Sequence, residues 1–127
     1  MHVNRLSVLM LFLWGWLCLG PVAPVLAQTA AAPQVLPTLL EFDRKNCPIC
    51  KASEQVILAV KDRYPGQFVV RKFYIDEEEN FFRRYKVAIV PTQVFLDAAG
   101  QEVGRHEGAY KQEALTQRLR ELKFIRD

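Results

Sequence analysis

The chain has 127 residues and a net charge of +3, from 17 basic and 14 acidic residues. This length allows one small domain. The basic residues are spread along the chain instead of forming a cluster, so the sequence predicts no nucleic-acid partner.

The first 27 residues are typical of an export signal. Arg5 precedes the apolar run Leu6 to Leu19, and the small-residue boundary Val25 to Ala27 follows. We therefore expect a signal peptide over residues 1–27 and a periplasmic or other extracytoplasmic location. An uncleaved anchor is the alternative, because Leu6 to Ala27 is almost long enough to span a bilayer, although prolines interrupt the run. A lipid anchor on Cys18 is disfavoured because Leu17, and not a small residue, precedes it.

The rest of the chain is divided into a short lead and a folded domain. Residues 28–36 are rich in Ala and Pro, and we expect a flexible lead there. The domain is expected over residues 37–127. Its size lies near the lower limit for a domain that folds without disulfides or metals.

The first half of this domain predicts a strand, a helix and a second strand. Thr38 to Phe42 is an apolar run with one acid inside it, Glu41, and predicts a buried strand followed by a polar loop. A helix is expected from Pro48 until Pro65-Gly66. Phe68 to Ile75 predicts the second strand. The apolar positions at helical spacing are Ala52, Val56, Ala59, Val60 and Tyr64.

The second half predicts a short helix, a hairpin and a closing helix. Asp76, with Glu79 three residues later, resembles a capping box for a helix ending near Tyr85. Thr92 to Leu96 and Gln101 to Glu107 flank a turn and predict a hairpin. The final helix is expected over Lys111 to Ile125, with Leu115, Leu119 and Leu122 on one face.

The segment Cys47-Pro48-Ile49-Cys50 carries the two cysteines that follow the signal. As a structural disulfide it would close too small a loop to stabilise the fold much. Zinc needs four ligands, and beyond this pair only His106 is available after the signal, so no metal site is predicted. A redox-active disulfide remains, because a helix N-terminus favours the thiolate form of Cys47. Pro48 suits the first helical turn.

Several further residues accompany the dithiol at characteristic positions. An acid precedes the dithiol by six residues, a strand lysine follows it, and a Val-Pro-Thr segment and a late glycine come after. Over roughly residues 36 to 125 the chain therefore resembles a thioredoxin-fold protein. The residues that carry this resemblance are Glu41, Cys47, Cys50, Lys51, Lys72, Val90, Pro91, Thr92 and Gly108.

The resemblance implies an α/β fold and a distinct role for each of four residues in the site. The fold would be a trimmed thioredoxin fold, a mixed four-stranded sheet flanked by helices in the order β-α-β-α-β-β-α. Cys47 would attack a substrate disulfide, and Cys50 would resolve the mixed disulfide. Glu41 would accept the Cys50 proton, because a buried acid has a raised pKa. Lys72 would modulate Glu41.

The resemblance also implies a substrate ledge beside the dithiol. Pro91 would be cis, which would leave the Val90 backbone free to pair with an extended substrate peptide. Ile49 would also contact substrate. Asn46 departs from the family, because thioredoxins usually have Trp before the dithiol.

These residues predict an exported thiol:disulfide oxidoreductase, most simply a disulfide reductase of protein substrates. The cofactor would be the Cys47-Cys50 disulfide itself, with no metal. The protein would be a monomer, reduced by a membrane electron carrier of the DsbD or CcdA type. Two alternatives stay open: a dithiol oxidase or isomerase, and a metal- or partner-binding module on the same fold.

Overall fold

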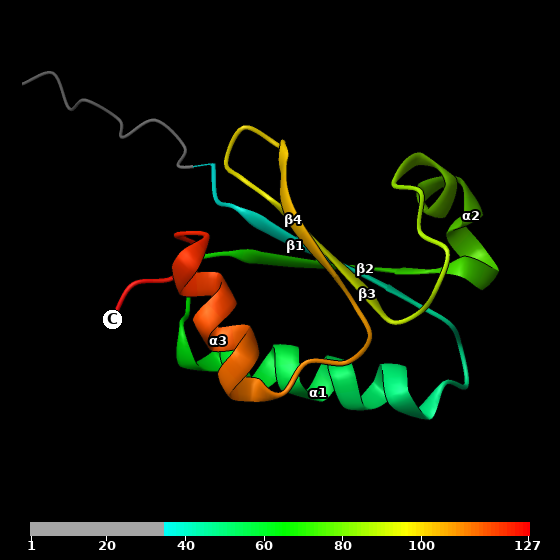
Figure 1. The fold of residues 1–127 in the computed structure, drawn as a ribbon, viewed down its shortest axis with the longest axis horizontal. Coiled ribbons are helices and arrows are strands. Elements are labelled where there is room, and N and C mark those ends of the chain that lie inside the picture. The colour runs from blue at the N-terminus through cyan, green and yellow to red at the C-terminus, as the bar shows by residue number, and fades with distance from the viewer. Residues whose placement is uncertain (1–34) are drawn as a thin grey trace, which may run out of the picture. The chain divides into compact units, whose positions relative to one another are not determined.

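The computed structural model describes residues 35–127, which form a four-stranded mixed sheet with helices on both faces (Figure 1). The predicted signal peptide over residues 1–27 and most of the predicted lead lie outside the described residues. Within residues 35–127 no helix is long and apolar enough to cross a membrane. The elements are β1 (Thr38–Asp43), α1 (Pro48–Arg63), β2 (Val69–Tyr74), α2 (Ile75–Arg84), β3 (Thr92–Leu96), β4 (Glu102–Glu107) and α3 (Gln112–Glu121).

The predicted element order and sheet are confirmed. The strand order is β2-β1-β3-β4, with β1 and β2 parallel and the other two pairs antiparallel. The central strands β1 and β3 are almost wholly buried, as apolar runs bounded by turn residues predict. The edge strands β2 and β4 are more exposed, and Phe73 is the one buried residue of the two strands.

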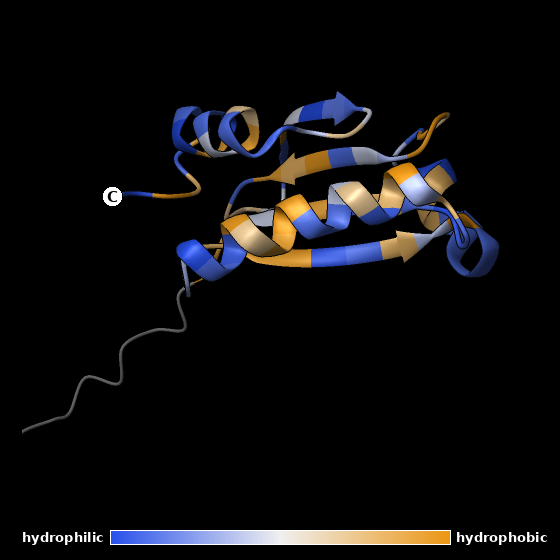
Figure 2. Cartoon of the chain, turned by 90° about the horizontal axis from the view of Figure 1, so that it is seen from below, coloured by the Kyte–Doolittle hydropathy of each residue, from blue (hydrophilic) through white to orange (hydrophobic). Residues whose placement is uncertain are grey.

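Side chains that alternate along β1 divide the core into two layers. Leu39 faces α1 and α3, where it packs with Ile57 of α1 and Leu115 of α3. Leu40 and its neighbours face the other way, toward α2. Figure 2 shows α1 in front of the strands and running along them, its ribbon changing between hydrophobic and hydrophilic colours from turn to turn. Glu41 shares the face of Leu39 and therefore points into the layer beneath α1.

One apolar pattern is only partly buried, and one local prediction is wrong. Of the apolar positions at helical spacing in α1, Val60 and the C-cap Tyr64 are buried, whereas Ala52 and Ala59 are exposed. Cys50, Ser53 and Ile57 complete the buried face of the helix. The capping box at Asp76 does not form: α2 begins at Ile75 without a side-chain cap. The Asp76 carboxylate instead accepts a hydrogen bond from the backbone N–H of Lys45, at 2.9 Å, and so ties the loop before α1 to α2.

Candidate active site

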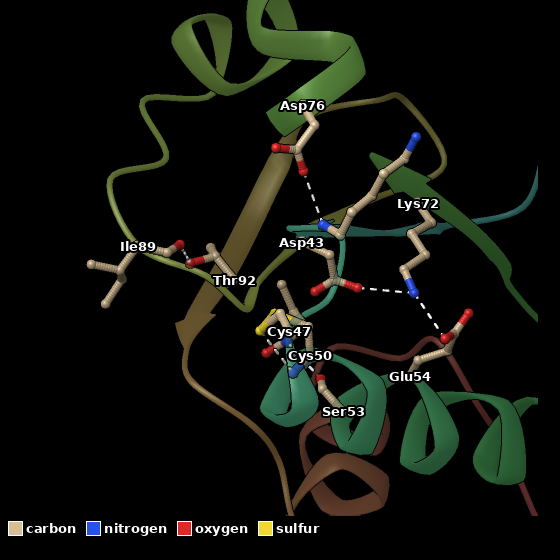
Figure 3. The surroundings of a disulfide bond; sticks show 11 residues. Asp43, Cys47, Cys50, Ser53, Glu54, Lys72, Asp76, Ile89 and Thr92 are labelled. Atoms are coloured by element: carbon tan, nitrogen blue, oxygen red, sulfur yellow. Dashed lines mark hydrogen bonds and ion pairs between the residues drawn. A yellow bond between two sulfur atoms is a disulfide. The ribbon is translucent and has the colours of Figure 1, made fainter. Parts of the chain in front are cut away.

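The two cysteines form a disulfide at the N-terminus of α1 (Figure 3). Cys47 is the N-cap residue, and its Sγ accepts a hydrogen bond from the backbone N–H of Cys50 at 3.2 Å. The helix N-terminus therefore stabilises negative charge on the Cys47 sulfur when the disulfide opens. Cys47 is half-buried and Cys50 is buried, so an incoming thiolate reaches Cys47 more easily.

The residues on either side of Cys47 set its position. Asn46 has a left-handed backbone, with φ of 58°, a conformation that Asn tolerates better than most residues. Pro48 occupies the first helical position, where its missing N–H costs no helical hydrogen bond. The substitution of the family's usual Trp by Asn46 therefore fits the turn that brings the chain from β1 into α1.

Pro91 lies at the same end of the sheet as the disulfide. Phe42, near the end of β1, pairs with Thr92 at the start of β3, so the loops beyond these two residues are neighbours. The Val90-Pro91 bond is cis, which confirms the expectation drawn from the resemblance. The Pro91 carbonyl accepts a hydrogen bond from the N–H of Gly108 at 2.7 Å.

The apolar residues predicted to contact substrate differ in exposure. Ile49 is 54% exposed, Val90 is half-buried and Pro91 is buried. Ile89, which the sequence did not single out, is 51% exposed and precedes the cis bond. The Thr92 hydroxyl donates to the Ile89 carbonyl at 2.7 Å and fixes this loop (Figure 3). The predicted substrate role of Val90, Pro91 and Ile49 stays a prediction.

Glu41 is a buried carboxyl group beneath α1, only 1% exposed. Burial and the nearby charge of Asp43 raise its pKa to about 8, against smaller lowering effects from Lys72 and from a hydrogen bond with Ser53. Ser53 lies three residues after Cys50 on the buried face of α1, so Glu41 lies one helical turn beyond Cys50. A carboxyl with this pKa can take up or release a proton near neutral pH.

A buried amide, Gln93, completes the layer around Glu41. It is fully buried, pairs directly with Glu41 across β1 and β3, and donates from Nε2 to the Ser53 hydroxyl at 3.1 Å. One oxygen of Glu41 and the Gln93 Oε1 have no hydrogen-bond partner in the described residues. The sequence did not single out Ser53 or Gln93.

Lys72 lies near Glu41 in register but makes its ion pairs elsewhere. Lys72 on β2 is the residue directly beside Glu41 in the register of β1 with β2. Its ammonium group, however, lies 3.0 Å from Asp43 Oδ2 and 2.9 Å from Glu54 Oε2 (Figure 3). Burial alone would lower the pKa of Lys72, but the hydrogen bonds with Glu54 and Asp43 outweigh it and raise the pKa.

A cavity of about 730 Å³ opens beside the disulfide. Cys47 and Cys50 line one side, and Asp43, Glu54 and Lys72 line another. Arg44 and Lys51 are exposed on its wall, and Lys45 there pairs with Glu77 of α2. The basic residues expected near the dithiol therefore border this cavity.

No group of three or more His, Cys, Asp or Glu side chains in residues 35–127 is arranged to hold a metal ion. His106 lies on β4, where its ring stacks on that of Tyr110 with 3.7 Å between ring centroids. The histidine is therefore held by an aromatic neighbour on the edge of the sheet.

Asp43 and Gln93 are two polar residues of this site that the sequence did not single out. Asp43 lies two residues after Glu41, hence on the same face of β1, and Gln93 follows the Pro91-Thr92 pair inside an apolar run. Each reads in isolation as a strand-end or solvent-facing polar residue. The alternation along β1 places Asp43 on the face of Glu41, whereas only the register of β1 with β3 places Gln93 beside Glu41.

Comparisons with known proteins agree with this architecture. The sequence matches the thioredoxin-like domain family over residues 26–123. It is 36% identical over 58 residues to Thioredoxin-1 of Drosophila melanogaster and, to the same extent, to Thioredoxin-1 of Drosophila yakuba. These matches cover 46% of this chain and 54% of each relative, so the chain spans about half the length of the curated relatives it matches.

Solved structures show the same fold. The germline-specific thioredoxin Deadhead of Drosophila melanogaster superimposes with a TM-score of 0.63 at 30% identity, covering 69% of this chain and 82% of that protein. The thioredoxin-2 described as a component of the malaria parasite protein secretion machinery gives a TM-score of 0.64 at 19% identity, covering 68% and 82%, and supports the fold alone. With its trimmed α/β sheet and its Cys47–Cys50 disulfide, the chain belongs to the thioredoxin-like domain family.

Proposed function

We propose that this protein is an exported thiol:disulfide oxidoreductase that works as a disulfide reductase on protein substrates. The observation that carries the proposal is the pairing of an accessible Cys47 at a helix N-terminus with a buried Cys50 one turn from the Glu41 carboxyl. The cysteine pair supplies a nucleophile and a resolving thiol. Glu41 supplies a proton acceptor with a pKa of about 8.

In the proposed cycle the Cys47 thiolate attacks one sulfur of a substrate disulfide. A mixed disulfide forms, and the first substrate sulfur leaves as a thiolate. Cys50 gives its proton to the Glu41 carboxylate, and the resulting thiolate attacks the Cys47 sulfur. The second substrate sulfur leaves, so the substrate gains two electrons and the protein returns to its Cys47–Cys50 disulfide.

The loop before β3 is suited to hold the substrate chain. The cis bond at Pro91 lies at the end of the sheet where the N-terminus of α1 presents Cys47, and the side chains of Ile49 and Ile89 are exposed. An extended peptide pairing with the Val90 backbone would place its disulfide beside Cys47. We propose that the Val90 backbone, Pro91 and Ile49 form the substrate-binding surface.

The proposed location and partners rest on the N-terminal sequence. The apolar run Leu6 to Leu19 and the boundary at Ala27 support export, and the family match begins next to that boundary. In an oxidising compartment a reductase needs a source of electrons. We propose a membrane electron carrier of the DsbD or CcdA type, acting on a monomer.

The reduction potential of the Cys47–Cys50 couple tests the direction of electron flow. Equilibration in glutathione buffers should give a value near the thioredoxin end of the range, about −270 mV, and the protein should catalyse reduction of insulin by dithiothreitol. Cys47→Ser should abolish the catalysis. A potential near the oxidising end, about −120 mV, would instead assign the protein as a dithiol oxidase.

A further inference from the structure

Asp43 is a buried carboxylate in the active site that the proposed cycle does not use. Its side chain is fully buried, yet it lies on the wall of the cavity that also reaches Cys47 and Cys50. It ends β1, two residues after Glu41 and on the same face. Two acids thus lie in one layer beneath α1.

Lys72 is the cation available to both acids. In register it is the neighbour of Glu41, but its ammonium group is held between Asp43 and Glu54, at 3.0 and 2.9 Å. Figure 3 shows the Lys72 side chain directed into the gap between these two carboxylates. One oxygen of Glu41 is left without a hydrogen-bond partner in the described part of the chain.

The other charged groups near Glu41 and Asp43 either bind other partners or lie outside the layer between the sheet and α1. From α2, Asp76 and Glu77 engage Lys45. On β2 the Tyr74 ring lies under Lys72, with 5.0 Å from the ring centroid to the ammonium nitrogen. Besides Lys45, the charged side chains of α1 and its preceding loop at the cavity wall are Arg44, Lys51 and Glu54. On the far side of Gln93 come His106 of β4 and Arg118 of α3, whose guanidinium lies over Gly104.

We propose that Asp43 is a positioning residue for proton transfer at Cys50: by holding Lys72 against Glu54, it keeps the cation away from Glu41, which therefore stays protonated in the oxidised protein. The inference rests on the proposed redox function and adds the residue that keeps the Lys72 charge away from Glu41. Glu54 is the second ion-pair partner of Lys72 and is more exposed than Asp43.

The step that Asp43 serves is the opening of the disulfide by a dithiol reductant. A thiolate of the reductant attacks the Cys47 sulfur, and the Cys47–Cys50 bond breaks with its electron pair going to Cys50. The Glu41 carboxyl gives its proton to the Cys50 sulfur. The second thiol of the reductant then displaces Cys47 as a thiolate, so the reductant becomes a disulfide and the protein gains two electrons.

Removing the Asp43 charge affects Glu41 in two ways that have the same sign. A negative charge two residues away is lost, which makes the Glu41 carboxylate easier to form. Lys72 also loses one of its partners and can turn toward its cross-strand neighbour, which stabilises the same carboxylate. Asp43→Asn keeps the shape of the side chain, so it isolates the charge.

The test uses the full chain with ¹³C-labelled Glu carboxyls, oxidised, and follows the Glu41 carboxyl by NMR from pH 4 to 10. In Asp43→Asn we expect its titration midpoint to fall by about one pH unit or more. Stopped-flow reduction by dithiothreitol should show the same displacement of its pH profile toward lower pH. Glu54→Gln removes only the more exposed ion-pair partner of Lys72. In this variant the Glu41 midpoint and the pH profile of reduction should move in the same direction as in Asp43→Asn, but less far.

Glu79→Gln is the matched control, because Glu79 pairs with Arg83 on the surface of α2. It should leave both profiles unchanged. If Asp43→Asn does not fold, Glu54→Gln carries the test alone. A Glu41 midpoint that stays at the wild-type value in the folded variants overturns the proposal. This readout needs no activity, whereas failure of the wild type to reduce insulin would overturn the proposed function only.

Discussion

Gln93 lies directly opposite Glu41 on the two central strands, and both side chains are buried on the face of the sheet that α1 covers. The row continues outward, to Lys72 on β2 and His106 on β4. A polar row therefore crosses all four strands at the level of the active site. At its two central positions, which a core would normally fill with apolar side chains, the row carries the Glu41 carboxyl and the Gln93 amide.

The raised pKa of Glu41 predicts that stability falls as pH rises. The folded protein holds a proton with a pKa of about 8, whereas the unfolded chain releases it near 4.5. The stabilisation is complete below pH 4.5 and is lost as pH rises through 8. Over this interval the free energy of unfolding of the oxidised protein should fall, on the order of a few kcal/mol.

Urea unfolding of the oxidised protein at a series of pH values from 5 to 9 measures this slope. Glu41→Gln should flatten it, because the amide does not titrate. Glu79→Gln, on the exposed surface of α2, should keep the wild-type slope. An unchanged slope in Glu41→Gln would show that the buried carboxyl is not the group responsible.

The two cysteines should behave differently when each is replaced. In Cys50→Ser the attacking thiol is kept but the mixed disulfide cannot be resolved, so a substrate such as insulin should stay covalently attached through Cys47. Non-reducing mass spectrometry detects that adduct. Cys47→Ser should give little of it, because Cys50 is buried at 2% exposure. Equal trapping by the two variants would contradict the assignment of Cys47 as nucleophile.

Ser53 should be sensitive to truncation, since the Gln93 amide beside Glu41 donates to its hydroxyl at 3.1 Å. Ser53→Ala leaves the Gln93 amide unpaired and should cost about 1–3 kcal/mol in urea unfolding at pH 7. In the double variant Ser53→Ala with Gln93→Leu, both partners are gone, and the loss should be smaller than the sum of the single losses. Strict additivity would show that the two side chains do not interact.

The sequence could predict the parts of this structure that depend on local pattern. The strands β1 and β3 are apolar runs between turn residues, and Gly66 and Gly100 adopt positive φ at the turns that end α1 and join β3 to β4. The buried face of α1 was harder, because Ala52, Ala59 and Ser53 are small enough for either environment. There the contacts of Ile57 and Val60 with β1 and α3 decide which side faces inward.

The polar and charged residues around Glu41 could be predicted only in part. The resemblance indicated Glu41 and Lys72, but the ion pairs of Lys72 depend on Asp43 and on Glu54 from a different element. Such contacts join residues distant in sequence, and no local pattern marks them. The failure at Asp76 has the same cause: its carboxylate is used by the loop before α1 and is therefore not available as a cap.

Gly108 should control the position of the Pro91 loop. Its φ of 98° lies in the region that favours glycine, and its N–H donates to the Pro91 carbonyl at 2.7 Å. No atom lies within 4 Å of an added Cβ, so the cost of Gly108→Ala comes from the backbone alone. We expect a loss of about 1–2 kcal/mol in urea unfolding and a larger KM for insulin. Gly66→Ala, a positive-φ glycine at the far end of α1 with equally open surroundings, is the matched control and should lose similar stability while keeping the wild-type KM. If both variants raised KM alike, the effect would reflect general destabilisation and not the Pro91 loop.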